Sequence, residues 1–233
     1  MPSTQVKERP ILFSAPMVRA ILDGSKSQTR RTVKNLGVFV DSEMTMRPPE
    51  PYHAKPGRFI FDDGTTCLCP YGTVGQQLWV REAFYIDHCD YLAGPLGSNR
   101  PADVDDDCLF YPADARGTGA WCCQVIPECC CAGVGKPRVR SARFMPRWAS
   151  RITLEITKVR VERLNEISEA NVWAEGAISH IVPHTWRKVY REPAERHRQA
   201  IFIFKKLWES INGDGSWDAN PWVWAISFRR VSP

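Results

Sequence analysis

The sequence lacks the long apolar runs that a membrane protein needs. None of its hydrophobic stretches approaches the roughly 18 consecutive apolar residues of a membrane-spanning helix. Residues 1–9 are polar, and the first apolar stretch, residues 11–22, is interrupted by Ser14, Pro16 and Arg19, so no secretory signal is expected. We therefore expect a cytoplasmic protein that does not contact a membrane.

The sequence also lacks the motifs of a well-defined metal site. Nine cysteines are present, but none of them has the paired CxxC spacing that identifies a structural zinc site. An odd number of cysteines without a secretion signal argues against a disulfide framework. Adjacent cysteines point in different directions, so we expect reduced, partly buried thiols and no cofactor. Zinc is the less favoured alternative, and its candidate ligands are Cys67, Cys69, Cys122, Cys123, Cys129, Cys130 and Cys131.

The composition is that of a globular protein with a mild basic excess. Hydrophobic residues make up 43% and charged residues 24% of the chain, so a packed core is expected. The 31 Lys and Arg exceed the 26 Asp and Glu by five, which suits an anionic partner without requiring one. Nine tryptophans supply core area and also flat faces on which nucleic-acid bases can stack.

Local patterns predict short strands with a few helices between them. Apolar and polar residues alternate along residues 152–162, which indicates a half-buried strand. Ser168 and Gly176 are placed to begin and end a short helix. This order of elements predicts an α+β fold with a small mixed β-barrel, and it argues against a parallel βαβ sheet. The other predicted strands are residues 11–13, 58–61, 78–84 and 221–229, and the other predicted helices are residues 14–24 and 193–211. The last of these helices has an apolar stripe formed by Ala200, Phe204, Leu207, Trp208 and Ile211.

A change in composition marks residues 86–141. This stretch holds an acidic run, many Gly and Pro residues and seven of the nine cysteines, and it has little periodicity. A structureless loop of such length is unusual in a compact domain and is often functional. We therefore predict a single domain, residues 1–233, with an irregular Cys-rich insertion at about residues 86–141.

A cationic motif follows the first predicted helix. It has the form Gly24-x-Lys26-x-x-Thr29-x-Arg31, and residues 25–31 as a whole are typical of a polar, positively charged turn. Taken alone, such a turn is more often a solvated structural feature than a functional one.

Two further features accompany this motif and make it more specific. A glycine-rich turn at Gly75 precedes a predicted strand, and Glu175 stands at the end of the short helix that follows the long strand. Together they resemble the ASCH domains of the PUA-like superfamily, and the runs at residues 145–155 and 208–224 resemble the phage and prophage branch of this family. The resemblance implies a PUA-like mixed β-barrel with flanking helices. It also implies that the protein acts in the cytoplasm of a bacterial host, if the chain derives from a phage or prophage. It covers residues 10–84 and 143–231.

The best understood ASCH enzymes are amidohydrolases that remove the acetyl group from 4-acetylcytidine. By position, Thr29 resembles the nucleophile, Lys26 the activating base and Glu175 the residue that shuttles or orients a proton. A Thr hydroxyl needs a nearby base to become a nucleophile, and a Lys becomes such a base when burial or a neighbouring cation lowers its pKa. The resemblance therefore implies a hydrolase that acts on an acylated nucleobase.

Two other functions remain open, a non-catalytic PUA-like binder of RNA or modified nucleotides and an ASCH-type ribonuclease. The expected partner is a nucleoside or RNA in every case. A closed, nucleoside-sized pocket favours the hydrolase, and a long basic groove favours the other two. Trp79 and Trp148 stand near arginines and are candidates for stacking on a base, although the core is the more common place for a Trp. The predicted binding residues are Arg30, Arg31, Trp79, Arg81, Arg147, Trp148 and Arg151.

Overall fold

The computed structural model describes seven segments of the chain, which contain both helices and strands. They are residues 6–34, 46–47, 58–61, 66–86, 109–114, 139–177 and 192–231. The α-helices are α1 (Ala15–Leu22), α3 (Glu169–Ala174) and α5 (Pro193–Asn212), and the 3₁₀ helices are η3 (Ala142–Phe144), η4 (Arg147–Ala149) and η5 (Leu164–Glu166). None of the helices within these segments combines the length and the apolarity needed to cross a membrane.

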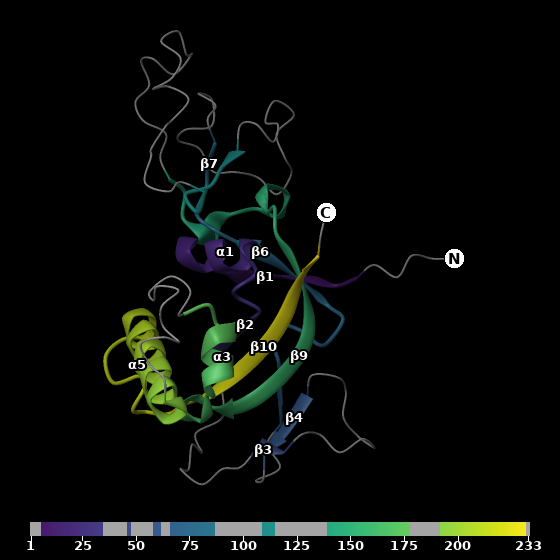
Figure 1. The fold of residues 1–233 in the computed structure, drawn as a ribbon. Helices are drawn as coiled ribbons and strands as arrows, with labels where there is room; N and C mark the ends of the chain where they lie inside the picture. The colour runs from purple at the N-terminus through teal and green to yellow at the C-terminus, as the bar shows by residue number, and fades with distance from the viewer. Residues whose placement is uncertain are drawn as a thin grey trace. The chain divides into compact units, whose positions relative to one another are not determined.

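The strands form three sheets. The largest has five strands in the order β1 (Glu8–Leu12), β6 (Gln77–Arg81), β9 (Thr153–Arg163), β10 (Trp222–Val231) and β2 (Gln28–Thr32). A second sheet joins β3 (Met46–Arg47), β4 (Arg58–Phe61) and β5 (Thr66–Leu68), and a third pairs β7 (Tyr85–Ile86) with β8 (Leu109–Phe110). Figure 1 shows β9 and β10 as two long strands that run side by side.

The five-stranded sheet is mixed, which confirms the predicted α+β class. Strands β10 and β2 are antiparallel, with Ala225 opposite Arg30. Strands β1 and β6 run in the same direction, because the N–H of Phe13 donates to the carbonyl of Arg81 and the N–H of Gln77 donates to the carbonyl of Lys7. Among the described strands the order ends at β1 and at β2, so these residues show an open sheet.

The chain divides into two compact units. The first unit comprises Met1–Arg9, Ala20–Gln77 and Leu154–Pro233, and the second comprises Pro10–Arg19 and Leu78–Thr153. The prediction of a single domain stays a prediction. Of the predicted insertion at residues 86–141, the structure describes only residues 86, 109–114 and 139–141.

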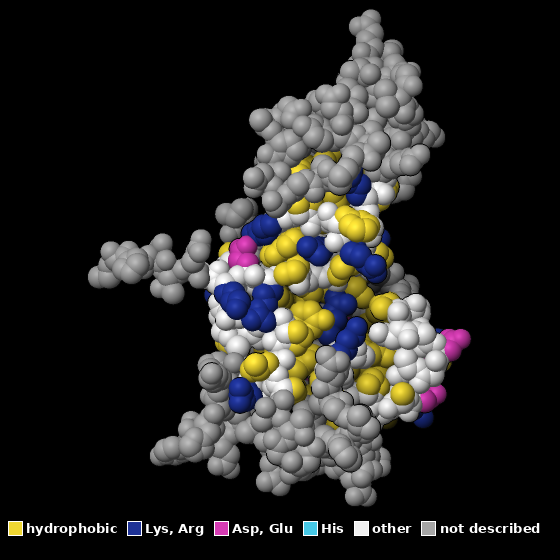
Figure 2. Space-filling view, turned by 180° about the vertical axis from the view of Figure 1, so that it is seen from behind, with side chains coloured by type: hydrophobic (Ala, Val, Ile, Leu, Met, Phe, Trp, Pro, Cys, Tyr) yellow, Lys and Arg dark blue, Asp and Glu magenta, His cyan; other side chains and the backbone are white. Residues whose placement is uncertain are grey.

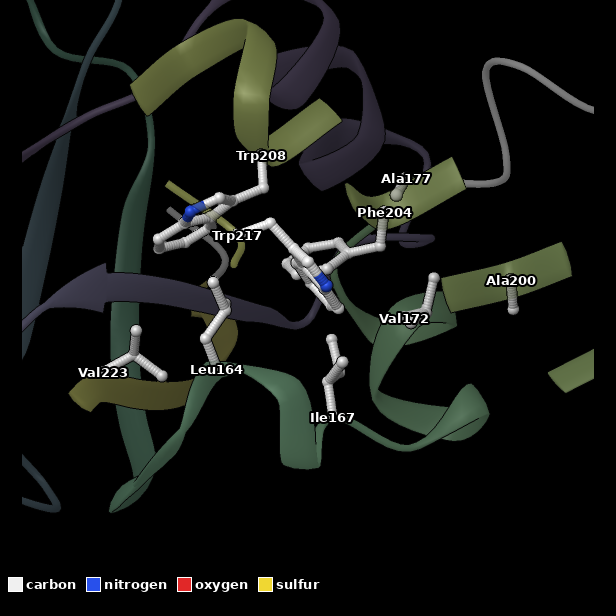
Figure 3. Close-up of a cluster of buried hydrophobic side chains, with 9 residues drawn as sticks. All are labelled: Leu164, Ile167, Val172, Ala177, Ala200, Phe204, Trp208, Trp217 and Val223. Carbon is white, nitrogen blue, oxygen red and sulfur yellow. The ribbon is translucent and has the colours of Figure 1, made fainter. Parts of the chain in front are cut away.

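The core of the first unit lies between α5 and the loops and strands beside it. Phe204 and Trp208 follow Ala200 at helical spacing, and all three side chains are buried. Trp217 meets Phe204 edge to face, with ring centroids 6.1 Å apart. Figure 3 shows these side chains pointing toward one another together with those of α3 and β10. The predicted apolar stripe is wrong at Ile211, which is 53% exposed because it lies in the last turn of α5, beyond the buried cluster.

The core of the second unit is a smaller apolar cluster. Phe84, Ile86, Leu109 and Met145 are buried in it, and Trp148 packs against it from η4. Leu109 belongs to β8, so at least this short part of the predicted insertion is packed into the unit.

Candidate functional site

The cationic motif is a buried strand and not a solvated turn, which corrects the sequence analysis. Residues 28–32 form β2, which pairs with the apolar strand β10. Lys26, Gln28, Thr29 and Arg30 are only 2–4% exposed. Polar local sequence predicted a turn here, but pairing with β10 supplies the backbone hydrogen bonds that make a strand.

Lys26 and Glu175 are brought together by the end of helix α3. The Ser168 side chain accepts a hydrogen bond from the N–H of Asn171 and starts α3, as predicted, and Glu175 ends the helix. The backbones of Lys26 and Glu175 form an isolated antiparallel bridge. Lys26 Nζ donates to Glu175 Oε2 at 3.0 Å and to the Glu175 carbonyl oxygen at 2.8 Å. The two residues are separated by 149 positions in the sequence.

Arg30 completes a buried cluster with this pair. Its Nη1 donates to the second carboxylate oxygen of Glu175 at 3.0 Å and to Gln28 Oε1 at 2.9 Å. Its Nη2 donates to Glu162 Oε1, and Glu162 also accepts a bond of 3.1 Å from Arg160. Cations and carboxylates therefore alternate from Lys26 through Glu175, Arg30 and Glu162 to Arg160. We call the first three residues the Lys26–Glu175–Arg30 cluster.

The pKa of Lys26 is lowered in this buried position. Burial is the largest cause of the lowered pKa, and the positive charges of Arg31 and Arg30 add to it, while Glu175 opposes it. Burial also lowers the pKa of Arg31, against the influence of Tyr71 and Glu175, and it raises the pKa of Tyr71. A lysine with a lowered pKa reaches its neutral form at a pH closer to neutrality, which is the form that a general base requires.

Thr29 does not share the face of the sheet on which Arg30 lies. Side chains alternate along a strand, so Thr29 and Arg31 of β2 project to the face opposite Gln28 and Arg30. Thr29 lies opposite Ile226 in the register with β10. The structure therefore unites two of the three predicted catalytic residues, Lys26 and Glu175, with Arg30, and it sets Thr29 on the other face from Arg30.

Two members of the site were missed by sequence reasoning, Glu162 and Gln28. Glu162 lies near the end of β9 and Gln28 at the start of β2. The alternation of polar and apolar residues marked Glu162 as a strand position, whereas Gln28 fell in the predicted turn and carried no such signal. No spacing in the sequence connects either of them to Glu175, because the contacts arise from the packing of distant segments.

The other predicted binding residues belong to the second unit. Trp79 is 8% exposed, and the guanidinium carbon of Arg81 lies 4.7 Å from the centroid of its ring, with that of Arg147 at 6.0 Å. Arg151 is bound by Glu82 through bonds of 3.0 and 3.1 Å. Burial raises the pKa of Glu82, while Arg151 opposes this shift. A common surface formed with Arg30 and Arg31, which are in the first unit, stays a prediction.

Two of the seven candidate zinc ligands, Cys67 and Cys69, are within the described residues. Both are free thiols, and burial raises the pKa of Cys67 to about 11 and that of Cys69 in the same direction. Within the described segments, no three His, Cys, Asp or Glu side chains gather in a way that could hold a metal ion. The remaining candidates, Cys122, Cys123, Cys129, Cys130 and Cys131, lie outside those segments.

Comparison with known proteins found no match among protein-family models, curated proteins or solved structures. The ASCH resemblance therefore depends on the motif residues, and any function inferred for the chain depends on the geometry around them.

Proposed function

We propose that this protein is an ASCH-type amidohydrolase that removes an acyl group from a nucleobase such as that of 4-acetylcytidine. In the proposal, Lys26 acts as the base and Glu175 holds and shuttles its proton. The proposed fold is a PUA-like barrel of which the mixed five-stranded sheet is the described part. The substrate is a nucleoside or the corresponding nucleotide in RNA.

The observation that supports the proposal is the buried contact between Lys26 and Glu175. The two motif positions stand at hydrogen-bond distance although 149 residues separate them in the sequence. A buried lysine whose pKa is lowered by burial and by neighbouring arginines is a recurrent feature of reactive sites. The same carboxylate binds Arg30, which fixes the orientation of Glu175 toward the lysine.

Amide hydrolysis requires a nucleophile, a base and a proton donor for the leaving amine. Neutral Lys26 accepts the proton of the nucleophile as it attacks the amide carbonyl, and Glu175, bonded to the resulting Lys26 ammonium, relays that proton to the leaving amine as the C–N bond breaks. Where the nucleophile is Thr29, water then hydrolyses the acyl-Thr ester and releases the acid. Arg30 is bonded to Glu175, Glu162 and Gln28, so its role here is to position Glu175. Thr29 is assigned as the nucleophile by the resemblance alone, and it is tested separately below.

The first test measures deacetylation of 4-acetylcytidine by the wild-type protein and by Lys26→Met, a change that preserves most of the side-chain volume. We expect the variant to lose at least about 100-fold in kcat/KM, the usual contribution of a general base. Wild-type activity should rise with pH through the Lys26 pKa, which lies below the ordinary value of 10.5, and this dependence should vanish in Lys26→Met.

Lys206→Met serves as the matched control, because Lys206 is an exposed lysine in α5. Its activity should equal that of the wild type. If the folded wild-type protein shows no turnover yet binds RNA with a salt-dependent affinity that Lys26→Met weakens, the hydrolase is rejected in favour of the non-catalytic binder.

The assignment of Thr29 is tested by comparing Thr29→Ser with Thr29→Val. Serine retains the hydroxyl, whereas valine has nearly the shape of threonine and lacks it. A nucleophilic Thr29 predicts substantial activity in Thr29→Ser and none in Thr29→Val. Equal activity in the two variants would show that another nucleophile, such as water, is activated by Lys26.

A further inference from the structure

Residues 138–151 form a segment with one sign of charge, which we call the arginine segment. It contains five arginines and no aspartate or glutamate. The structure describes the part from residue 139 onward, which lies in the second unit and contains η3 and η4. A run of like charges on a folded surface needs either local carboxylates or an anionic partner. The arginines are Arg138, Arg140, Arg143, Arg147 and Arg151.

Helix η3 presents an aromatic side chain to solvent within this segment. The Ser141 side chain accepts a hydrogen bond from the N–H of Arg143, and Ala142 and Met145 are buried on either side of the turn. Phe144 is left 73% exposed, more than any other large hydrophobic side chain that the structure describes. Its exposure is therefore imposed by a turn that is anchored at both ends, and its ring is available to a partner.

Two arginines beside Phe144 have no carboxylate partner among the described residues. Arg81 donates to the carbonyl oxygen of Arg143 at 3.2 Å, and its guanidinium lies over the Trp79 ring. Neither Arg81 nor Arg143 forms an ion pair within the described segments, whereas Arg151 is neutralised by two carboxylates. Arg147 approaches the same Trp79 ring.

Figure 2 shows one face of the protein, on which Lys and Arg side chains lie among hydrophobic ones.

We propose that the surface formed by Phe144, Arg143, Arg81 and Arg147 binds single-stranded nucleic acid. An unpaired base stacks on the exposed ring of Phe144, and the flanking phosphates bind the guanidinium groups. A duplex keeps its bases stacked inside, so it offers no base to Phe144. This surface goes beyond the proposed hydrolase, because it uses neither Lys26 nor Glu175 and lies in the other unit.

The proposal is tested by fluorescence anisotropy with labelled single-stranded RNA and DNA of about 12 nucleotides, within the usual range of single-strand sites. Wild-type protein should bind the single strands, and the affinity should fall as salt rises. Phe144→Ala should weaken binding about tenfold, as the loss of one base–aromatic contact does. Arg143→Gln should weaken binding and reduce the slope of log affinity against log salt by about 0.7, the share of one phosphate contact.

Two control variants remove an aromatic ring or a positive charge at positions outside the proposed surface. Phe202 is an exposed phenylalanine of α5 and Arg230 an exposed arginine of β10, both in the first unit. Phe202→Ala and Arg230→Gln should bind as the wild type does. The RNA and DNA arms show which sugar the surface accepts, and binding of either supports the proposal.

Three results would overturn the proposal. They are equal affinity for a duplex of the same sequence, unchanged affinity in Phe144→Ala, and binding to anionic phospholipid vesicles without binding to the single strands. Lys26→Met separates this inference from the proposed function, since it should abolish deacetylation and leave strand binding unchanged.

Discussion

At the scale of single residues, the Lys26–Glu175–Arg30 cluster is a compromise between desolvation and attraction. Burying a charge costs several kcal/mol, and the attraction of partners offsets this cost only when the geometry is good and the remaining hydrogen-bond positions are filled. Here one carboxylate serves two cations through separate oxygens, at 3.0 Å each. The arrangement holds only as long as Glu175 is charged.

Replacing Glu175 by Gln therefore should be much more damaging than its small change in shape suggests. We expect Glu175→Gln to lower the free energy of unfolding by about 3–5 kcal/mol, because the buried Lys26 loses the carboxylate it pairs with and the buried Arg30 retains only Glu162. Glu155→Gln is the matched control: Glu155 pairs with the largely exposed Arg229, and this variant should lose less than about 1 kcal/mol. Urea denaturation of both variants measures the difference, and equal losses would contradict a special role for Glu175.

At the scale of elements, the site depends on how closely α3 approaches the chain before β2. Gly176 follows the helix with φ of +70°, a conformation that suits glycine at the end of a helix. A Cβ at this position would lie 2.9 Å from Lys26 Cβ and 3.0 Å from Ala20 Cβ. The absence of a side chain at residue 176 is thus what lets Glu175 bridge to Lys26.

Gly176→Ala and Gly215→Ala separate the backbone strain of an added side chain from its steric clash. The two glycines have similar positive φ, +70° and +76°, but a Cβ at Gly215 would meet nothing within 4 Å. Both variants should lose stability through backbone strain, and Gly176→Ala should lose a further 1–3 kcal/mol, roughly the cost of overpacking. Chemical denaturation compares them, and the absence of an additional loss in Gly176→Ala would show that α3 can move away from Lys26 freely.

At the scale of the whole molecule, three strands contain residues of both compact units. Strands β1, β6 and β9 each cross the boundary between the units, for example at Gln77 and Leu78 in β6. The predicted single domain therefore implies that both cores melt together.

This hypothesis predicts one cooperative unfolding transition in calorimetry. Phe84→Ala in the core of the second unit and Phe204→Ala in the core of the first should each lower the same midpoint, since removing a buried Phe costs about 3–5 kcal/mol. Phe144→Ala and Phe202→Ala, which remove exposed rings, should leave that midpoint nearly unchanged. Two transitions, each sensitive to only one of the core variants, would show that the units are separate domains.

The sequence by itself determined the elements that carry their own local signals. Alternation along residues 152–162 identified β9, helical spacing of apolar residues identified α5, and the Ser168 cap with Gly176 identified α3. The boundaries shifted by a few residues, as at β6, which ends at Arg81. These features could be predicted because each depends on the periodicity or capping of neighbouring residues.

Only the tertiary structure decided what becomes of the cationic motif. Its burial comes from pairing with β10, about 200 residues later, and its charge is balanced by Glu175 and Glu162. Thr29 is only three residues after Lys26 and next to Arg30 in the sequence. In β2, however, its side chain projects from the opposite face of the sheet to that of Arg30. The physical reason is that side chains in a strand alternate with a period of two, and the choice between turn and strand is made by a distant partner.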